Sequence, residues 1–196
     1  MENSALLVLH YQNSVAHPDG IWGKDLYPQI SKNRSYENAR TVLDAARSIV
    51  LPVIYVNVAY RPGAPELPDA LFGIVATARS SDHCIVGSWG AQPIDELTPE
   101  KGDVQIENFN SDAFQGTALD QVLRARGVST VYLIGQVIEH VVGTTMKRAA
   151  NSGYSAVLLA DCVGGYSDST HEAMLDILSG YGRISDSKEF VSAAHS

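Results

Sequence analysis

Short, continuous apolar runs recur along the chain and predict buried strands. Runs of this length without polar alternation are typical of parallel strands that are covered on both faces. They occupy residues 5–9 (ALLVL), 51–59 (LPVIYVNVA), 131–134 (VYLI) and 156–160 (AVLLA), and residues 104–108 (VQIEN) form a further predicted strand.

Between these runs, apolar residues recur every three or four positions and predict helices. The stripes lie within residues 39–49, 119–123, 141–149 and 173–178. Gly127 stands where a helix commonly ends, and Ser35 is a candidate N-cap. Alternating strands and helices predict an α/β fold with a doubly wound parallel sheet. Ligands then bind at the edge where the strands have their carboxyl ends.

Residues 60–100 interrupt this alternation. They contain Pro62, Pro65, Pro68, Pro93 and Pro99 and no long periodic stretch. We therefore expect a single domain over residues 1–196 with an irregular insert at about 60–100. Irregular segments of this length usually form a lid, a binding loop or an interface arm.

Composition narrows the classes of function. The 196 residues include 22 acidic and 14 Lys or Arg side chains, giving a net charge of −8, and no stretch is basic enough to follow a phosphate backbone. We expect no nucleic-acid partner. Only 18% of residues are charged, which favours a surface partly covered in a homo-oligomer, a dimer or larger. Cys84 and Cys162 are expected to be reduced thiols. No signal peptide or membrane span is expected, so the predicted location is cytoplasmic.

Three features at strand ends are candidates for chemistry. His10 ends the first strand and is either a general acid or base or a histidine satisfied by backbone groups. Glu107 and Asn108 close the strand at 104–108, where Glu107 is either a second catalytic carboxylate or a solvated side chain. Glu139 and His140 open a helix whose N-terminus can polarise a bound group. That helix offers no Ser, Thr or Cys before Thr144.

Metal and cofactor sites are not expected. The sequence Asp82-His83-Cys84 looks like a ligand cluster, but three adjacent residues in an ordinary loop cannot all face one ion. No phosphate-binding glycine loop, nucleophile elbow or zinc-protease motif is present.

Several segments together resemble the isochorismatase-like, or cysteine hydrolase, superfamily. In chain order they are residues 5–12 (ALLVLHYQ), 87–92 (GSWGAQ), 97–99 (LTP), 102–104 (GDV), 111–119 (SDAFQGTAL), 123–127 (LRARG), 153–154 (GY) and Asp161. The resemblance implies a six-stranded parallel sheet with helices on both faces, and commonly a dimer or larger oligomer. It covers residues 4–187.

The resemblance also implies where the catalytic residues of such hydrolases would stand. The family's Asp, Lys and Cys correspond to His10, Asn108 and Val141 in this sequence. A valine cannot attack a carbonyl carbon. The Asp-x-His metal signature of the nicotinamidase branch is replaced at residues 57–62 (NVAYRP). Cysteine-dependent amidase or nicotinamidase chemistry is therefore not expected.

Two hypotheses follow. In the first, the chain is an enzyme that acts on a small molecule by cofactor-free acid/base chemistry, with His10 as the proton-transfer group and Asn108 as a substrate-orienting amide. In the second, it is a catalytically inactive binding or structural subunit. The side chains predicted to contact substrate are Tyr11, Tyr60, Trp89, Glu107, Phe114, Glu139, His140 and Val141.

Overall fold

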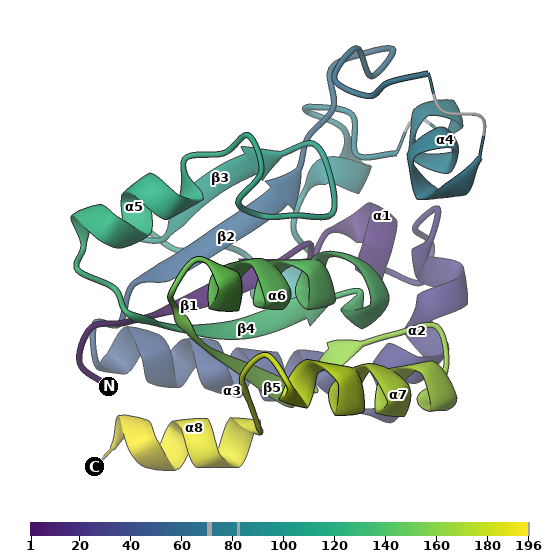
Figure 1. The fold of residues 1–196 in the computed structure, drawn as a ribbon. Helices are drawn as coiled ribbons and strands as arrows, with labels where there is room; N and C mark the ends of the chain where they lie inside the picture. Colours follow the sequence, from purple (N-terminus) through teal and green to yellow (C-terminus); the bar gives the residue numbers. More distant parts are fainter. Residues whose placement is uncertain (70–71, 82, 196) are drawn as a thin grey trace.

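The computed structural model describes residues 1–69, 72–81 and 83–195 and shows one six-stranded, all-parallel sheet (Figure 1). Its strand order is β3-β2-β1-β4-β5-β6. The strands are β1 (Ser4–Leu9), β2 (Val53–Val58), β3 (Val104–Asn108), β4 (Thr130–Gln136), β5 (Ser155–Gly164) and β6 (Arg183–Ser185). The doubly wound, six-stranded parallel sheet expected from the sequence is confirmed.

Helices cover both faces of the sheet (Figure 1). The α-helices are α1 (Asn13–Ala16), α2 (Gly23–Lys32), α3 (Ser35–Ser48), α4 (Gly73–Ser80), α5 (Leu119–Ala125), α6 (Gly143–Asn151), α7 (Asp168–Ser179) and α8 (Ser187–Ala194). Shorter turns are the 3₁₀ helices η1 (Trp89–Ala91) and η2 (Asp95–Leu97) and the π-helix η3 (Ile138–Val142).

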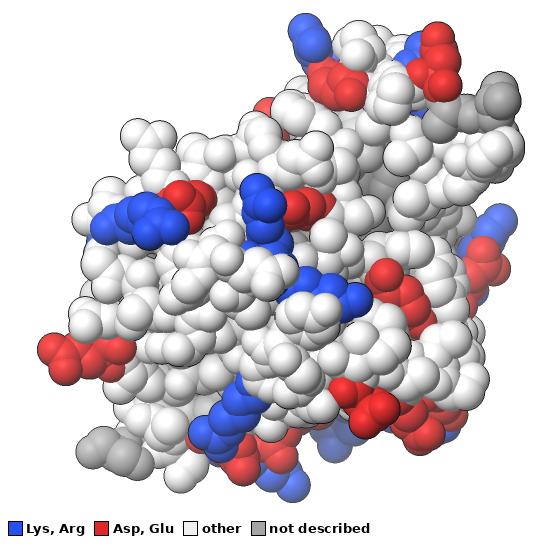
Figure 2. Space-filling model, viewed as in Figure 1, with Lys and Arg blue, Asp and Glu red and all other residues white. Residues whose placement is uncertain are grey.

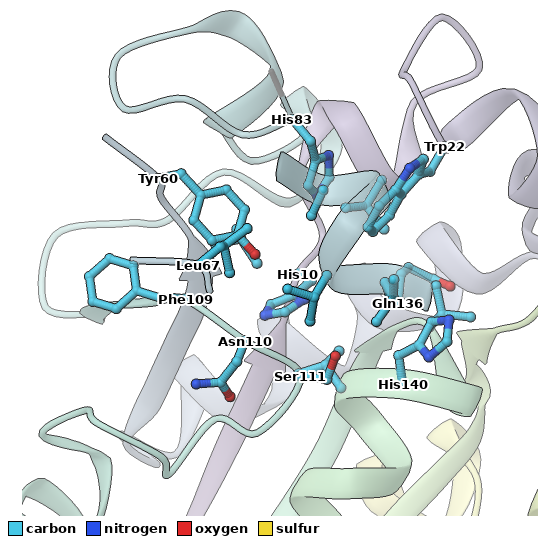
Figure 3. A pocket seen from close by; sticks show the side chains of 17 residues that line it. His10, Trp22, Tyr60, Leu67, His83, Phe109, Asn110, Ser111, Gln136 and His140 are labelled. Atoms are coloured by element: carbon cyan, nitrogen blue, oxygen red, sulfur yellow. The ribbon is translucent and has the colours of Figure 1, made fainter. Parts of the chain in front are cut away.

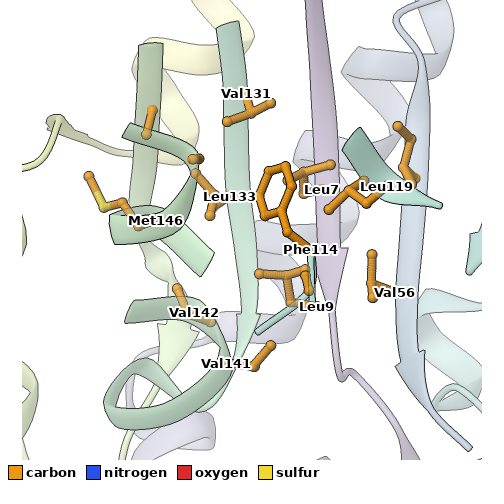
Figure 4. Close-up of a cluster of buried hydrophobic side chains, with 14 of the residues drawn as sticks. Leu7, Leu9, Val56, Phe114, Leu119, Val131, Leu133, Val141, Val142 and Met146 are labelled. Atoms are coloured by element: carbon orange, nitrogen blue, oxygen red, sulfur yellow. The ribbon is translucent and has the colours of Figure 1, made fainter. Parts of the chain in front are cut away.

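Alternate side chains of each strand pack against opposite helical layers. Leu7 and Leu9 of β1 lie in a buried cluster with side chains of α5, α6 and α7 (Figure 4). Leu6 and Val8, on the other face, pack with α3 and α8. Burial on both faces explains why β1 reads as an unbroken apolar run.

Elements without an apolar stripe or run were not predicted. β6 has only three residues, and α1 has four. The segment expected to be an irregular insert contains α4, η1 and η2, so it is partly helical. α7 is capped by Ser167, whose side chain accepts a hydrogen bond from the Thr170 backbone N–H.

The carboxyl end of β4 lies unusually close to β1. A Cβ atom at Gly135 would come within 2.3 Å of the Leu9 carbonyl oxygen, so only glycine permits this approach. The close contact brings the residues that follow β1 and β4 to one place at the sheet edge.

Acidic and basic side chains are interspersed over the face seen in Figure 2, without a continuous basic surface. Within residues 1–69, 72–81 and 83–195, no helix combines the length and the apolar character needed to cross a bilayer.

Candidate active site

A cavity lies at the carboxyl edge of the sheet, with His10 near its centre (Figure 3). Its volume is about 60 Å³. The cavity therefore suits a small molecule. The described residues that line it are His10, Val15, Trp22, Val58, Tyr60, Leu67, Ile74, Val75, Ala78, His83, Phe109, Asn110, Ser111, Gln136, Val137, His140 and Val141.

His10 is held by a chain of hydrogen bonds that fixes its ring. The backbone at His10 has a φ of 51°, which turns the chain sharply out of β1. The Asn108 Nδ2 group donates to the Asn110 carbonyl oxygen (2.8 Å), so Asn108 presents Oδ1 to His10 Nε2 at 3.1 Å. Since this oxygen only accepts, His10 Nε2 carries the proton, and a neutral His10 has its lone pair on Nδ1.

Burial keeps two cavity histidines neutral. It lowers the pKa of His10 to about 3, against an opposing effect of the Asn108 hydrogen bond, and nearby His83 and His140 lower it further. Burial likewise lowers the pKa of His83 to about 4. At neutral pH both rings are therefore uncharged.

His83 was not predicted as a site residue, yet it forms part of the cavity wall with Trp22. Its Nδ1 atom lies 2.6 Å from the Ser14 hydroxyl oxygen, and its ring stacks on that of Trp22 with centroids 4.0 Å apart. Asp82, its neighbour in the expected but rejected metal cluster, lies outside the described residues. Among the residues that are described, no group of three or more His, Cys, Asp or Glu side chains could hold a metal ion.

Three of the residues predicted to contact substrate line the cavity. They are Tyr60, His140 and Val141. Val141 is 1% exposed and supplies only an apolar surface. No cysteine among the cavity-lining residues replaces it. Burial raises the pKa of the Cys84 thiol to about 12 and also raises that of Cys162, so both remain protonated at neutral pH.

Three aromatic side chains predicted at the site are not among the lining residues. Tyr11 is fully buried in the core beside α3, where its hydroxyl lies 2.9 Å from Ser35 Oγ. Phe114 packs in the cluster on the other face of the sheet (Figure 4). Trp89 is 49% exposed and meets the His17 ring edge-on. None of the three rings lines this cavity, because each packs elsewhere.

The two predicted carboxylates also lie outside the cavity lining. Glu107 is exposed, because alternation along β3 turns Ile106 and Asn108 inward and Glu107 outward. Glu139 accepts hydrogen bonds from the Tyr166 backbone N–H (3.0 Å) and the Thr170 hydroxyl (2.6 Å), and so braces the start of α7.

A comparison with known protein families identifies the family to which this fold belongs. The family model described as "Isochorismatase domain" matches residues 4–189, nearly the whole chain. The chain belongs to the isochorismatase family. The resemblance read from the sequence segments is thereby confirmed at the level of the family.

Named relatives of this isochorismatase-family chain include hydrolases. It is 28% identical to the ureidoacrylate amidohydrolase RutB of Methylobacterium radiotolerans, over 96% of this chain and 78% of that protein. It is 30% identical to an uncharacterized isochorismatase family protein, YwoC, of Bacillus subtilis, over 84% of each.

Solved structures show the same fold. The N-carbamoylsarcosine amidase of Thermoplasma acidophilum superposes with a TM-score of 0.77 and 30% identity, covering 94% of this chain and 96% of that one. An isochorismatase family protein from Desulfovibrio vulgaris gives a TM-score of 0.86 at 19% identity, covering 99% of both chains. The second similarity bears on the fold alone.

Proposed function

We propose that this isochorismatase-family chain is an enzyme that acts on a small molecule by cofactor-free acid/base chemistry, without a cysteine nucleophile. The observation that carries the proposal is the His10–Asn108 hydrogen bond at the cavity. A histidine whose tautomer is fixed by a buried amide is a typical arrangement for proton transfer.

The positions that resemble the family's Asp, Lys and Cys are His10, Asn108 and Val141. With valine at the third position, attack by a thiolate is not open to this chain. His10 Nδ1 can instead accept a proton from water or from the substrate. This chemistry supports hydrolysis by an activated water, isomerisation or elimination. The amidohydrolase and amidase names of two relatives favour hydrolysis among these.

The geometry changes the role proposed for Asn108. Its side chain is fully buried, and its two polar atoms are engaged by His10 and Asn110. We therefore assign Asn108 as a positioning residue that holds the His10 ring, rather than as a group that touches substrate. With a pKa of about 3, His10 acts as an acceptor and not as an acid at neutral pH.

The second candidate function is a catalytically inactive binding or structural subunit. It is favoured by Val141 at the cavity, because an apolar filler retains the cavity without any reactive group. Under this hypothesis His10 would contribute only hydrogen bonding.

A panel of small carbonyl and enol-ether compounds distinguishes the two candidates. We expect the purified protein to convert at least one compound, detected as a new product by NMR, and His10→Ala to be impaired. Compounds that raise the melting temperature of both proteins equally, with no conversion by either, would instead establish the binding subunit.

We also propose that the chain forms a homo-oligomer, most simply a two-fold dimer. The low charged fraction supports this, as do the half-exposed apolar side chains of Ile177 and Trp89. Light scattering at micromolar concentration should give at least twice the chain mass of 21.1 kDa. A scattering mass equal to that of one chain would contradict this expectation.

A further inference from the structure

We infer that the cavity takes an uncharged molecule that donates a hydrogen bond, and that it discriminates against anions of the same size. This inference rests on the proposed function, because it names the class of ligand for the same cavity. It concerns binding, and it can be tested without any turnover.

The cavity contains no counter-charge for an anion. None of the described residues that line it is Lys, Arg, Asp or Glu. The four residues outside the described part of the chain are Ala70, Leu71, Asp82 and Ser196, none of which is a cation. Among the described lining residues, only the histidines could become cations by taking up a proton. Burial keeps His10 and His83 neutral at neutral pH.

Charged side chains flank the cavity without lining it, and Arg79 among them is engaged by Asp69 and by the carbonyl oxygens of Ala64 and Leu67. Glu139 precedes the lining residue His140 and interacts with it electrostatically. One of its carboxylate oxygens, Oε2, is buried without a hydrogen-bond partner among the described residues. A carboxylate ligand would therefore lose its hydration in a cavity whose described lining offers no cation to offset that loss.

The polar environment of the cavity favours a ligand that donates a hydrogen bond. The neutral His10 ring offers its Nδ1 lone pair, since Nε2–H is used by Asn108. Gln136 also lines the cavity (Figure 3), but its amide reaches Ser35 of α3, to which Nε2 donates, and its buried Oε1 atom lies against Gly164 of β5. A ligand N–H or O–H can satisfy the His10 lone pair, whereas a carboxylate has no proton to donate.

The remaining surface is apolar and aromatic. Tyr60 and Phe109 stand on one side of the cavity and Trp22 on the other, and Leu67 lies beside Tyr60 (Figure 3). These walls stabilise the uncharged part of a ligand by burial. The lining thus combines apolar walls with neutral acceptors.

Three isosteric probes test charge and donor separately. Propionamide is neutral and donates, butanone is neutral without a donor, and propionate is an anion without a donor. Titrations at neutral pH are followed through the indole N–H signal of Trp22. Trp89, the second of the two tryptophans and outside the lining, serves as the internal control. We expect propionamide to bind at least about tenfold more tightly than propionate, which corresponds to about 1.4 kcal/mol, with butanone between them.

A pair of variants at Ser111 tests the charge argument directly. Ser111 lines the cavity, and no hydrogen bond of its side chain is seen within the described residues. Ser111→Lys should bind propionate at least about tenfold more tightly than Ser111→Met, which has a similar length and no charge.

The following results would overturn the inference. Propionate binding as tightly as propionamide to the wild-type protein would overturn it, and so would the lack of a saturable Trp22 shift with propionamide. Equal propionate affinity of the two Ser111 variants would refute the missing counter-charge as the cause. None of these results depends on turnover, so failure of the proposed catalysis remains distinguishable.

Discussion

His10→Ala should lower turnover by about 10²–10⁴-fold, the usual contribution of a general acid or base. The ring is the only lining group whose orientation is fixed by a buried amide, among the contacts that the described residues show. Removing it leaves the cavity and its aromatic walls in place, so ligand affinity should change less than turnover. The measurement is kcat and KM for the compound that the panel identifies.

The backbone at His10 requires a second variant. Its φ of 51° is unfavourable for alanine and better tolerated by asparagine. His10→Asn should therefore lose as much turnover as His10→Ala while folding more stably. His195→Ala, at the exposed end of the chain, is the matched histidine control and should retain wild-type rates. Undiminished turnover in both His10 variants would remove this side chain from the mechanism.

The sheet was predictable because its strands are buried on both faces. β1 and β4 have no solvent-facing side to interrupt their apolar runs, so the continuous run itself predicts a strand that is covered on both faces. β3 has an exposed alternate face, so its sequence shows no continuous apolar run. β6 and α1 have too few residues to show any period.

The meeting of three candidate residues at one edge of the sheet was also predictable. His10, Val141 and Asn108 follow or end strands whose carboxyl ends meet at one sheet edge, which parallel topology requires. The pairing of His10 with Asn108 spans 98 residues, and its hydrogen bond is a consequence of β1 and β3 flanking β2.

The walls of the cavity were not predictable from local pattern. Trp22 and His83 come from the segments after α1 and after α4, and only the folded chain stacks them together. Tyr11 was a reasonable aromatic candidate beside His10. The chain turns at His10, however, and sends the Tyr11 side chain into the opposite core layer. An aromatic residue next to a site residue therefore carries little information about which way it faces.

The stability of the protein should fall steeply as the pH drops from about 6.5 towards 4. An unfolded histidine has a pKa near 6.5, whereas burial lowers the pKa to about 3 for His10 and about 4 for His83 in the folded protein. Between these values the unfolded chain binds more protons, so the free energy of unfolding rises with pH and its full value is present above about 6.5. Each histidine contributes a slope of about 1.4 kcal/mol per pH unit. Urea unfolding at a series of pH values measures the combined slope.

His10→Asn isolates one of the histidine contributions, since burial also lowers the pKa of His140 and His171. Asparagine does not titrate, and it tolerates the positive φ. Between pH 4 and 6.5, the slope of the free energy of unfolding against pH should therefore be smaller in this variant by roughly 1.4 kcal/mol per pH unit, the contribution of one proton. A His10→Asn slope identical to that of the wild type would show that His10 is not held neutral by burial. The lone pair assigned to Nδ1 would then be protonated in mild acid, and the base role proposed for His10 would be lost there with it.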